Sequence, residues 1–92
     1  MRITFDPAKN DRNGRLRRPS FDQVAHFAFD TALYAVDERK EYPESRFVAL
    51  GLHGDRVHVL CSSETPDGIR VISFRKANSR EVKRYAKARI AD

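Results

Sequence analysis

One segment of the chain joins a strand pattern to a helix pattern: Gly68-Ile69-Arg70-Val71-Ile72-Ser73-Phe74-Arg75-Lys76-Ala77-Asn78-Ser79-Arg80-Glu81-Val82-Lys83-Arg84-Tyr85. Its first half is rich in β-branched and aromatic residues, which favours a strand over 69–75. Its second half predicts a helix over about 79–90, because Asn78 suits the N-cap and Glu81 the third helical position. Eight cations and one anion lie between Arg70 and Arg89. Such a surface suits a polyanion, and RNA is the first to consider.

The composition is that of one small folded domain, and we treat residues 1–92 as a single unit. Hydrophobic residues make up 40% and charged residues 34% of the chain, which excludes a disordered or membrane-embedded protein. No apolar run approaches the roughly 18 residues of a membrane span. Cys61 is the single cysteine, so we expect no internal disulfide and predict a reducing, cytoplasmic location. The net charge of +5 favours nucleic acid or an acidic protein as the partner.

Two further helices are expected near the N-terminus. Asp6-Pro7 suits the start of a helix over 7–12, because aspartate caps well and proline fits the first helical position. Asn13-Gly14 would end that helix, since both residues tolerate positive φ. Ser20-Phe21-Asp22-Gln23 indicates a capping box at the start of a second helix over 21–29.

Strands are predicted at 3–5, 32–36, 46–52, 56–62 and 69–75 from alternation and flanking turn residues. Short turn-rich separators between the last three imply hairpins and therefore antiparallel pairing. We predict an α+β fold: a small antiparallel meander with two N-terminal helices and a C-terminal helix.

Several pieces of the chain, in their order and spacing, resemble one family. They are Phe5-Asp6-Pro7-Ala8-Lys9 with Asn13, then Ser20-Phe21, Arg46-Phe47-Val48-Ala49-Leu50-Gly51, and Gly68 to Ala77 with Glu81 and Tyr85. The resemblance covers nearly the whole length and is to BrnT, the toxin of BrnT–BrnA type II toxin–antitoxin systems. It implies a RelE-like fold, metal-independent RNA cleavage, no cofactor, and neutralisation by a BrnA antitoxin. BrnA carries a DNA-binding domain, so operator DNA is expected only through the antitoxin, in a complex that represses its own operon.

Two positions depart from the family pattern. Members usually carry Lys-His-Gly-Val where this chain has Leu16-Arg17-Arg18-Pro19. Arg17 stays protonated near neutral pH, so it suits phosphate binding and not proton transfer. The residue after Ser73 is often alanine in the family and is Phe74 here.

The candidate catalytic cations are three arginines that match the family. Metal-free cleavage uses the ribose 2′-hydroxyl as nucleophile and needs cations at the phosphate oxygens, which guanidinium groups supply. Arg75 is the first choice, followed by Arg46 and Arg70. In an unbulged strand Arg70 and Arg75 face opposite sides, so both line one site only if a bulge intervenes. Each could instead be a solvated strand arginine, and Arg46 could form a surface ion pair.

Three other residues could take part in proton transfer. Glu81 could be a general base, or it could close a capping box with Asn78. Tyr85 could donate a hydrogen bond to phosphate, or it could pack in the core. His58 has an ordinary pKa near neutrality, but a strand histidine is more often structural.

A basic helix side and one connector residue are the candidate RNA contacts: Arg80, Lys83, Arg84, Lys87 and Arg17. The helix side could equally be a solvated face or a dock for an acidic antitoxin segment. No histidine pair has metal-site spacing, so no metal is expected. The competing function is a non-catalytic toxin-like binding module that acts within a nucleic-acid-binding complex. A DNA-binding repressor acting alone is weaker, because no recognition helix is evident.

Overall fold

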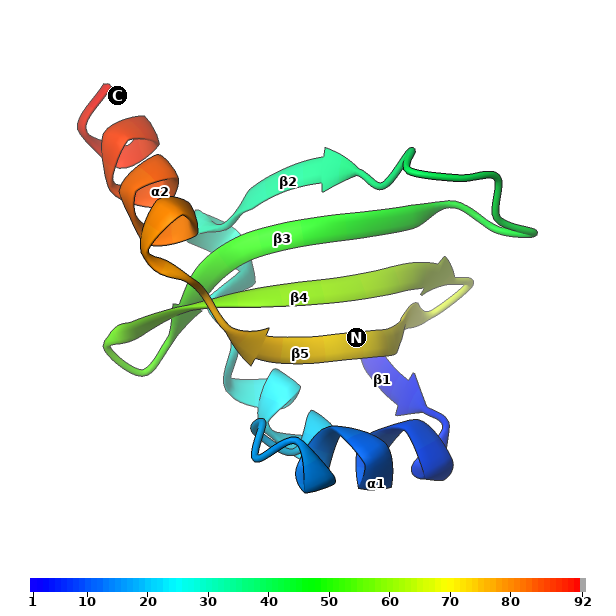
Figure 1. The fold of residues 1–92 in the computed structure, drawn as a ribbon. Helices are drawn as coiled ribbons and strands as arrows, with labels where there is room; N and C mark the ends of the chain where they lie inside the picture. Colours follow the sequence, from blue (N-terminus) through cyan, green and yellow to red (C-terminus); the bar gives the residue numbers. More distant parts are fainter. Residues whose placement is uncertain (92) are drawn as a thin grey trace.

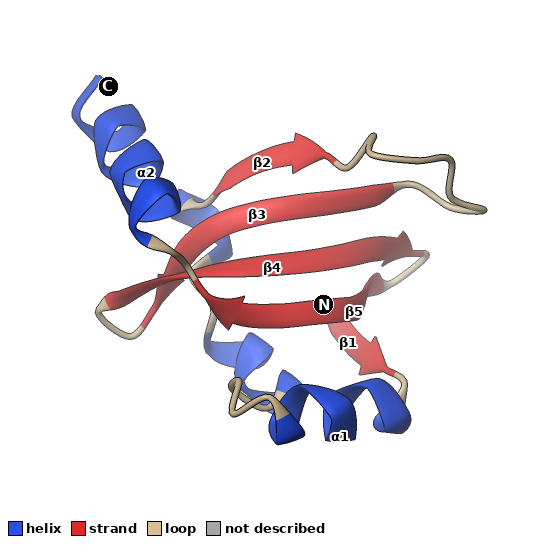
Figure 2. Cartoon of the chain, viewed as in Figure 1, coloured by secondary structure: helices blue, strands red, loops and turns tan. Residues whose placement is uncertain are grey.

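The computed structural model describes residues 1–91, and the α+β class is confirmed (Figure 2). The strands are β1 (Arg2–Phe5), β2 (Leu33–Val36), β3 (Arg46–His53), β4 (Arg56–Thr65) and β5 (Gly68–Lys76). The α-helices are α1 (Pro7–Arg15) and α2 (Ser79–Ala91), and two 3₁₀ segments are η1 (Phe21–His26) and η2 (Phe29–Thr31). Among the described residues, no helix has both the length and the apolar character to cross a membrane.

The five strands form one sheet in the order β1-β5-β4-β3-β2 (Figure 1). The pairs β2–β3, β3–β4 and β4–β5 are antiparallel, which confirms the predicted meander. β1 pairs with β5 in parallel, so the sheet is mixed and the prediction of a purely antiparallel sheet is wrong. A Cβ at Gly68 would collide with the backbone carbonyl of Arg2, so the glycine allows β1 this close approach. Alternation identified β1 as a strand, but its partner is set by a long-range contact.

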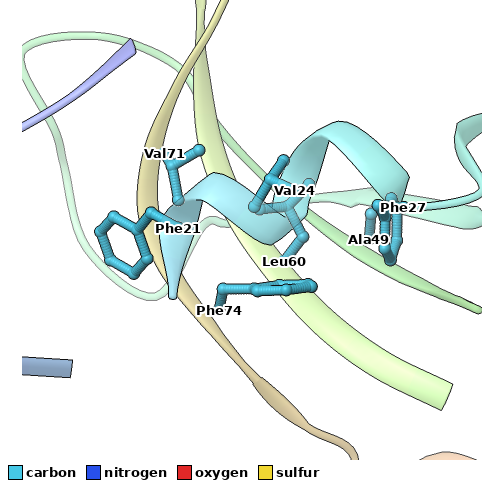
Figure 3. Close-up of a cluster of buried hydrophobic side chains, with 7 residues drawn as sticks. All are labelled: Phe21, Val24, Phe27, Ala49, Leu60, Val71 and Phe74. Carbon is cyan, nitrogen blue, oxygen red and sulfur yellow. The ribbon is translucent and has the colours of Figure 1, made fainter. Parts of the chain in front are cut away.

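The main core lies between the sheet and η1 (Figure 3). Phe21 and Val24 of η1 pack against the side chains of β4 and β5, and Phe74 of β5 is fully buried at the centre of the cluster. The buried members are Phe21, Val24, Phe27, Ala49, Leu60, Val71 and Phe74. We call the side of the sheet that carries this cluster the η1 face.

The second predicted helix is wrong in type and length. Residues 21–26 form a 3₁₀ segment, and Phe27 then forms an isolated antiparallel bridge with His53. Ser20 caps η1 as expected, but the Gln23 side chain contacts His53 instead of closing a capping box. The same spacing of apolar residues is compatible with a short 3₁₀ segment. Tertiary contacts ended this segment before a longer α-helix could form.

The first helix starts as predicted but ends later. Asp6 caps α1 and accepts a hydrogen bond from the amide of Ala8. Asn13 does not end the helix; it is buried and its Nδ2 donates to the carbonyl oxygens of Pro19 and Phe74 at 2.7 and 3.1 Å. The side-chain amide of Asn13 therefore connects the turn after α1 to β5. These tertiary contacts outweigh the tendency of asparagine to end a helix.

Candidate functional site

A bulge in β5 decides which arginines share a face. Cys61 of β4 pairs with Ser73, but the next residue of β4 pairs with Val71, so β5 carries one extra residue between them. An extra residue shifts the alternation of side chains by one. Arg70 and Arg75 therefore lie on the same side of the sheet, although an odd number of residues separates them. The alternative that the sequence left open is thus resolved in favour of a shared face.

A row of polar residues crosses this side of the sheet, away from η1. Ser63 of β4 is the cross-strand partner of both Arg46 of β3 and Arg70 of β5. The Nε of Arg46 and the Oγ of Ser63 are buried and have no hydrogen-bond partner among residues 1–91. Both groups can donate to a phosphate oxygen, and a buried polar group left unpaired costs about 1–3 kcal/mol. We call the side that carries Arg46, Ser63, Arg70 and Arg75 the arginine face.

The loop over residues 37–45, between β2 and β3, lies at the end of the sheet opposite α2 (Figure 2). The guanidinium of Arg46 lies over the ring of Tyr42, with Cζ 4.1 Å from the ring centroid. The Tyr42 hydroxyl donates to Oδ2 of Asp37 at 3.2 Å, and Arg39 donates to both oxygens of Asp37 at 2.9 and 2.8 Å. These bonds, chiefly those from Arg39, hold the pKa of the buried Asp37 carboxyl far below its usual range. The loop therefore has a defined arrangement around Arg46.

Arg75 forms a bidentate ion pair with Glu81 at the start of α2. Its two terminal nitrogens donate to Oε1 and Oε2 at 2.8 and 2.9 Å. Glu81 also forms the predicted capping box, because Oε1 accepts from the amide of Asn78 at 2.8 Å and its own amide donates to Oδ1 of Asn78 at 2.9 Å. The hydrogen bond from Arg75 lowers the pKa of Glu81, and the same bond raises the pKa of Arg75. Both oxygens of the carboxylate are engaged in this arrangement.

Arg39 brings a fourth guanidinium to the arginine face. The bond to Glu81 dominates the shift in the pKa of Arg75, but the positive charge of Arg39 acts against it. Arg39 is bonded to Asp37, whose Oδ2 also accepts from Tyr42, and Arg46 lies over the Tyr42 ring, so Arg39 belongs to the group of residues around Arg46. The side chain of Arg39 is 78% exposed, so it is accessible to a ligand in solvent.

Tyr85 and His58 lie in different surroundings. Tyr85 is 7% exposed and packs on Leu50 and Val59, and Val59 is the cross-strand partner of Arg75. Because Tyr85 follows Glu81 by one helical turn, it lies on the same side of α2. His58 belongs to the η1 face, where its ring lies 5.2 Å from that of Phe74. The sheet therefore separates His58 from the arginine face.

The predicted RNA contacts form two groups. The predicted contacts on α2 are all exposed: Arg80, Lys83, Arg84 and Lys87. Arg17 is exposed in the turn after α1, on the η1 side of the sheet, and has a left-handed backbone with φ of 58°. It lines a cavity together with His58.

Sequence reasoning missed Ser63 of the arginine face and three loop residues beside Arg46: Asp37, Arg39 and Tyr42. The loop was interpreted only as charged and irregular. Its available signal was the Asp37–Arg39 spacing, which suits an Asx turn, and the Arg39 amide does donate to Oδ1 of Asp37. Ser63 lies in a run of polar residues, Ser62 to Thr65, beyond the strand predicted over 56–62, so the sequence carries no signal that distinguishes it.

An apolar cavity of about 460 Å³ opens on the η1 face. Phe29, Phe47 and Ile69 contribute to its lining, which among the described residues includes no lysine or arginine. Such a surface does not suit a phosphate group. The candidate phosphate-binding residues lie elsewhere: on the arginine face, on α2 and in the turn that carries Arg17.

Residues 5–81 match the family model described as "Ribonuclease toxin, BrnT, of type II toxin-antitoxin system". The chain belongs to the BrnT family. The matched range includes every residue of the arginine face, from Arg46 to Arg75, and reaches Glu81. Membership implies ribonuclease activity on RNA and an antitoxin partner. Neither the comparison with curated proteins nor that with solved structures gives a match.

The ion pair in this BrnT family member predicts how stability depends on pH. The pKa of Glu81 is lowered in the fold, so its ionised form contributes stability above its ordinary pKa of 4.5, and this contribution is lost as the pH falls through the lower folded-state value. We expect Glu81→Gln to reduce the free energy of unfolding by about 1 kcal/mol at neutral pH, since Arg75 is partly solvated. Urea denaturation at neutral pH and at pH 3 measures the difference, which should shrink on acidification. A constant difference would contradict this origin.

Ser63 provides a second test of the BrnT arginine face. Ser63→Ala removes a buried hydroxyl that has no partner among the described residues, so we expect the free energy of unfolding to stay constant or rise by up to about 1 kcal/mol. If the hydroxyl serves a ligand, RNA affinity should fall severalfold at the same time. Thermal denaturation and RNA titration measure the two effects. A loss of stability with unchanged RNA affinity would show that Ser63 is structural.

Proposed function

We propose that this BrnT family member cleaves RNA without a metal ion on the arginine face. The observation that carries the proposal is the bulge in β5, which gives Arg70 and Arg75 a common side with Arg46. The phosphate of RNA gains negative charge on its oxygens in the transition state, and preorganised guanidinium groups are suited to stabilise it. Arg39 is a fourth cation at this surface.

The chemistry begins when an RNA phosphate competes with Glu81 for Arg75. The carboxylate that Arg75 releases accepts the proton of the ribose 2′-hydroxyl, whose oxygen bonds to phosphorus. The bond from phosphorus to the 5′-oxygen then breaks, and that oxygen takes up a proton. Tyr85 lies one turn after Glu81 and is the proposed donor. The products are a 2′,3′-cyclic phosphate and a 5′-hydroxyl, and no water or redox partner is consumed.

The exposed cations of α2 extend this surface. Arg80 and Arg84 are one helical turn apart, and Lys87 follows. They suit the backbone of the RNA strand beyond the cleaved phosphate, or an acidic segment of the antitoxin that covers the arginine face. We propose a BrnA-like antitoxin, a complex that represses its own operon, a cytoplasmic location, and a single domain with a RelE-like fold.

The test is incubation of the purified protein with single-stranded RNA in the presence of EDTA. We expect fragments that end in 2′,3′-cyclic phosphate, detected by their resistance to a phosphomonoesterase until acid opens the ring. Addition of the antitoxin encoded by the neighbouring gene should stop the reaction. Intact RNA under these conditions would overturn the proposal, and 3′-hydroxyl ends would overturn the mechanism.

The second candidate function is a binding module without catalysis. One observation favours it: both oxygens of Glu81 are held by Arg75, and one of them also by the amide of Asn78. A carboxylate held in this way is a weak base. RNA that binds tightly, remains uncut and depends on the same arginines would support this candidate.

A further inference from the structure

A second group of cations surrounds a cavity of about 360 Å³ on the η1 side of the sheet. Three separate parts of the chain form it: the turn after α1, the hairpin between β3 and β4, and the paired ends of β4 and β5. The lining consists of Arg17, Arg18, Pro19, His53, Asp55, Arg56, His58 and Lys76. Long-range folding therefore gathers a site whose members lie far apart in sequence.

The charges of this cavity are unbalanced. Four cations line it against one carboxylate, Asp55, which gives a net charge of 4 − 1 = +3. Within residues 1–91 the ion pairs join Arg39 to Asp37 and Arg75 to Glu81, so the four cations have no ionic partner there. Like charges held together raise the free energy of the fold and attract an anion.

Arg17 has a left-handed backbone at this site. Its φ of 58° lies in a region that is unfavourable for a residue with a Cβ. The turn holds it there, because the amide of Arg17 donates to the carbonyl of Gly14 and the amide of Arg18 to that of Asn13. These two hydrogen bonds form the Schellman motif that ends many helices, in which glycine would fit this backbone without strain. The motif fixes the place of Arg17 beside the cavity.

His58 contributes an unpaired polar atom. The residue is 3% exposed, and its Nδ1 lies 3.1 Å from the carbonyl oxygen of Arg56. A carbonyl oxygen only accepts hydrogen bonds, so Nδ1 carries the hydrogen and Nε2 of the neutral ring is an acceptor. The hydrogen bond of this ring within residues 1–91 is made by Nδ1, and Nε2 is not one of the buried atoms left unpaired there, so it is open to a ligand from solvent. A ribose 2′-hydroxyl is a donor that such an atom can accept.

The position of the cavity connects it to the arginine face. Lys76 is the cross-strand partner of His58 and lines the cavity, whereas the preceding residue, Arg75, points to the arginine face. A strand of nucleic acid that passes around this end of β5 can contact Arg75 on one side of the sheet and Lys76 on the other. A small free anion can bind at only one of the two sites at a time.

We propose that this cavity is a second RNA-binding site, which holds the sugar–phosphate backbone of a strand that also occupies the arginine face. The proposal rests on RNA being the substrate. Arg17, Arg18, Arg56 and Lys76 bind phosphate, and Nε2 of His58 accepts a hydrogen bond from a ribose 2′-hydroxyl. The site extends the footprint on RNA and does not perform the cleavage.

The experiment measures binding of a short single-stranded RNA at several salt concentrations by fluorescence anisotropy. All proteins carry Arg75→Ala so that the RNA stays intact. The cavity variant is Arg17→Gly with Lys76→Gln, and the control, Arg15→Gln with Arg89→Gln, removes the same charge from exposed positions outside the cavity. For single strands the slope of log affinity against log salt falls by about 0.7 for each phosphate that the protein no longer neutralises. We expect a decrease of about 0.7–1.4 in the cavity variant and none in the control.

Equal decreases in the two variants, or no decrease in the cavity variant, would overturn the second site. Arg17→Gly relieves backbone strain, so a higher melting temperature together with weaker binding shows that the variant binds less RNA without being unfolded. His58→Phe keeps a ring but removes the acceptor, and should narrow the difference in affinity between RNA and DNA severalfold. An unchanged difference would overturn the ribose contact. RNA cleavage by the parent protein is measured separately. If the parent cleaves RNA but the salt slope of the cavity variant is unchanged, the second site alone is contradicted. If the salt slope decreases as expected but the parent leaves RNA intact, the proposed catalysis alone is contradicted.

Discussion

Arg75→Ala is expected to lower the rate of RNA cleavage by about two to three orders of magnitude, which is the usual effect of removing one preorganised donor from a transition-state oxyanion. Arg75 combines two features that make it the most sensitive position. Its guanidinium can hold two phosphate oxygens at once, and it controls the availability of Glu81. Single-turnover rates with labelled RNA measure the effect. Arg75→Lys retains the charge without the fork of donors and should show an intermediate loss.

Arg89→Ala is the matched control for this prediction. It removes the same charge from an exposed position on α2 and should leave the rate within about twofold, because an isolated surface charge contributes little. Loss of the pair with Glu81 also lowers stability, so rates are compared well below the melting temperature of each variant. A rate for Arg75→Ala within severalfold of the parent would contradict the proposed site.

Phe74→Ala is expected to reduce the free energy of unfolding by about 3–5 kcal/mol, the range for removal of a buried phenylalanine ring. Phe74 is fully buried, and its ring lies 6.1 Å from that of Phe27 and 5.6 Å from that of His53. A small domain is stable by about 5–15 kcal/mol, so this loss removes a large share. Urea denaturation followed by circular dichroism measures it.

Two further variants serve as comparisons for Phe74→Ala. Phe74→Leu retains most of the apolar volume and should cost clearly less than alanine does. Leu16→Ala truncates a side chain that is 58% exposed and should change stability by no more than about 0.5 kcal/mol. A cost for Phe74→Ala as small as that of Leu16→Ala would show that the core is centred elsewhere. The sequence marked Phe74 only as a departure from the family; its packing explains why a large residue is required.

Local patterns predicted those elements of the fold whose signal is local. The caps at Asp6 and Asn78 were correct, because each depends on a side chain and amides within three residues of it. Strand patterns located all five strands, since alternation reflects burial of one face. The 3₁₀ form of η1 was missed, because the length of a helix depends on the contacts that end it, here the bridge of Phe27 to His53.

The candidate site likewise has features that depend on local sequence and features that depend on long-range contacts. The arginines were recognisable from sequence, but whether Arg70 and Arg75 share a face depended on a bulge that leaves no clear mark in the residues between them. The sequence does not reveal the role of Tyr42, because its partner Arg46 lies in another element. The assignment of these residues to RNA chemistry stays a prediction that the substitutions above will test.

The sequence by itself determined the strands, the helix caps, the basic character of the chain and its membership of the BrnT family. These depend on residue type, on spacing along the chain and on the order of motifs. Only the tertiary structure decided that β1 pairs in parallel with β5, that Arg46, Arg70 and Arg75 lie on one side of the sheet, and that Arg17 joins His58 and Lys76 on the other. The physical reason is that register, bulges and loop packing are set by contacts between distant residues, whose free energies no local pattern contains.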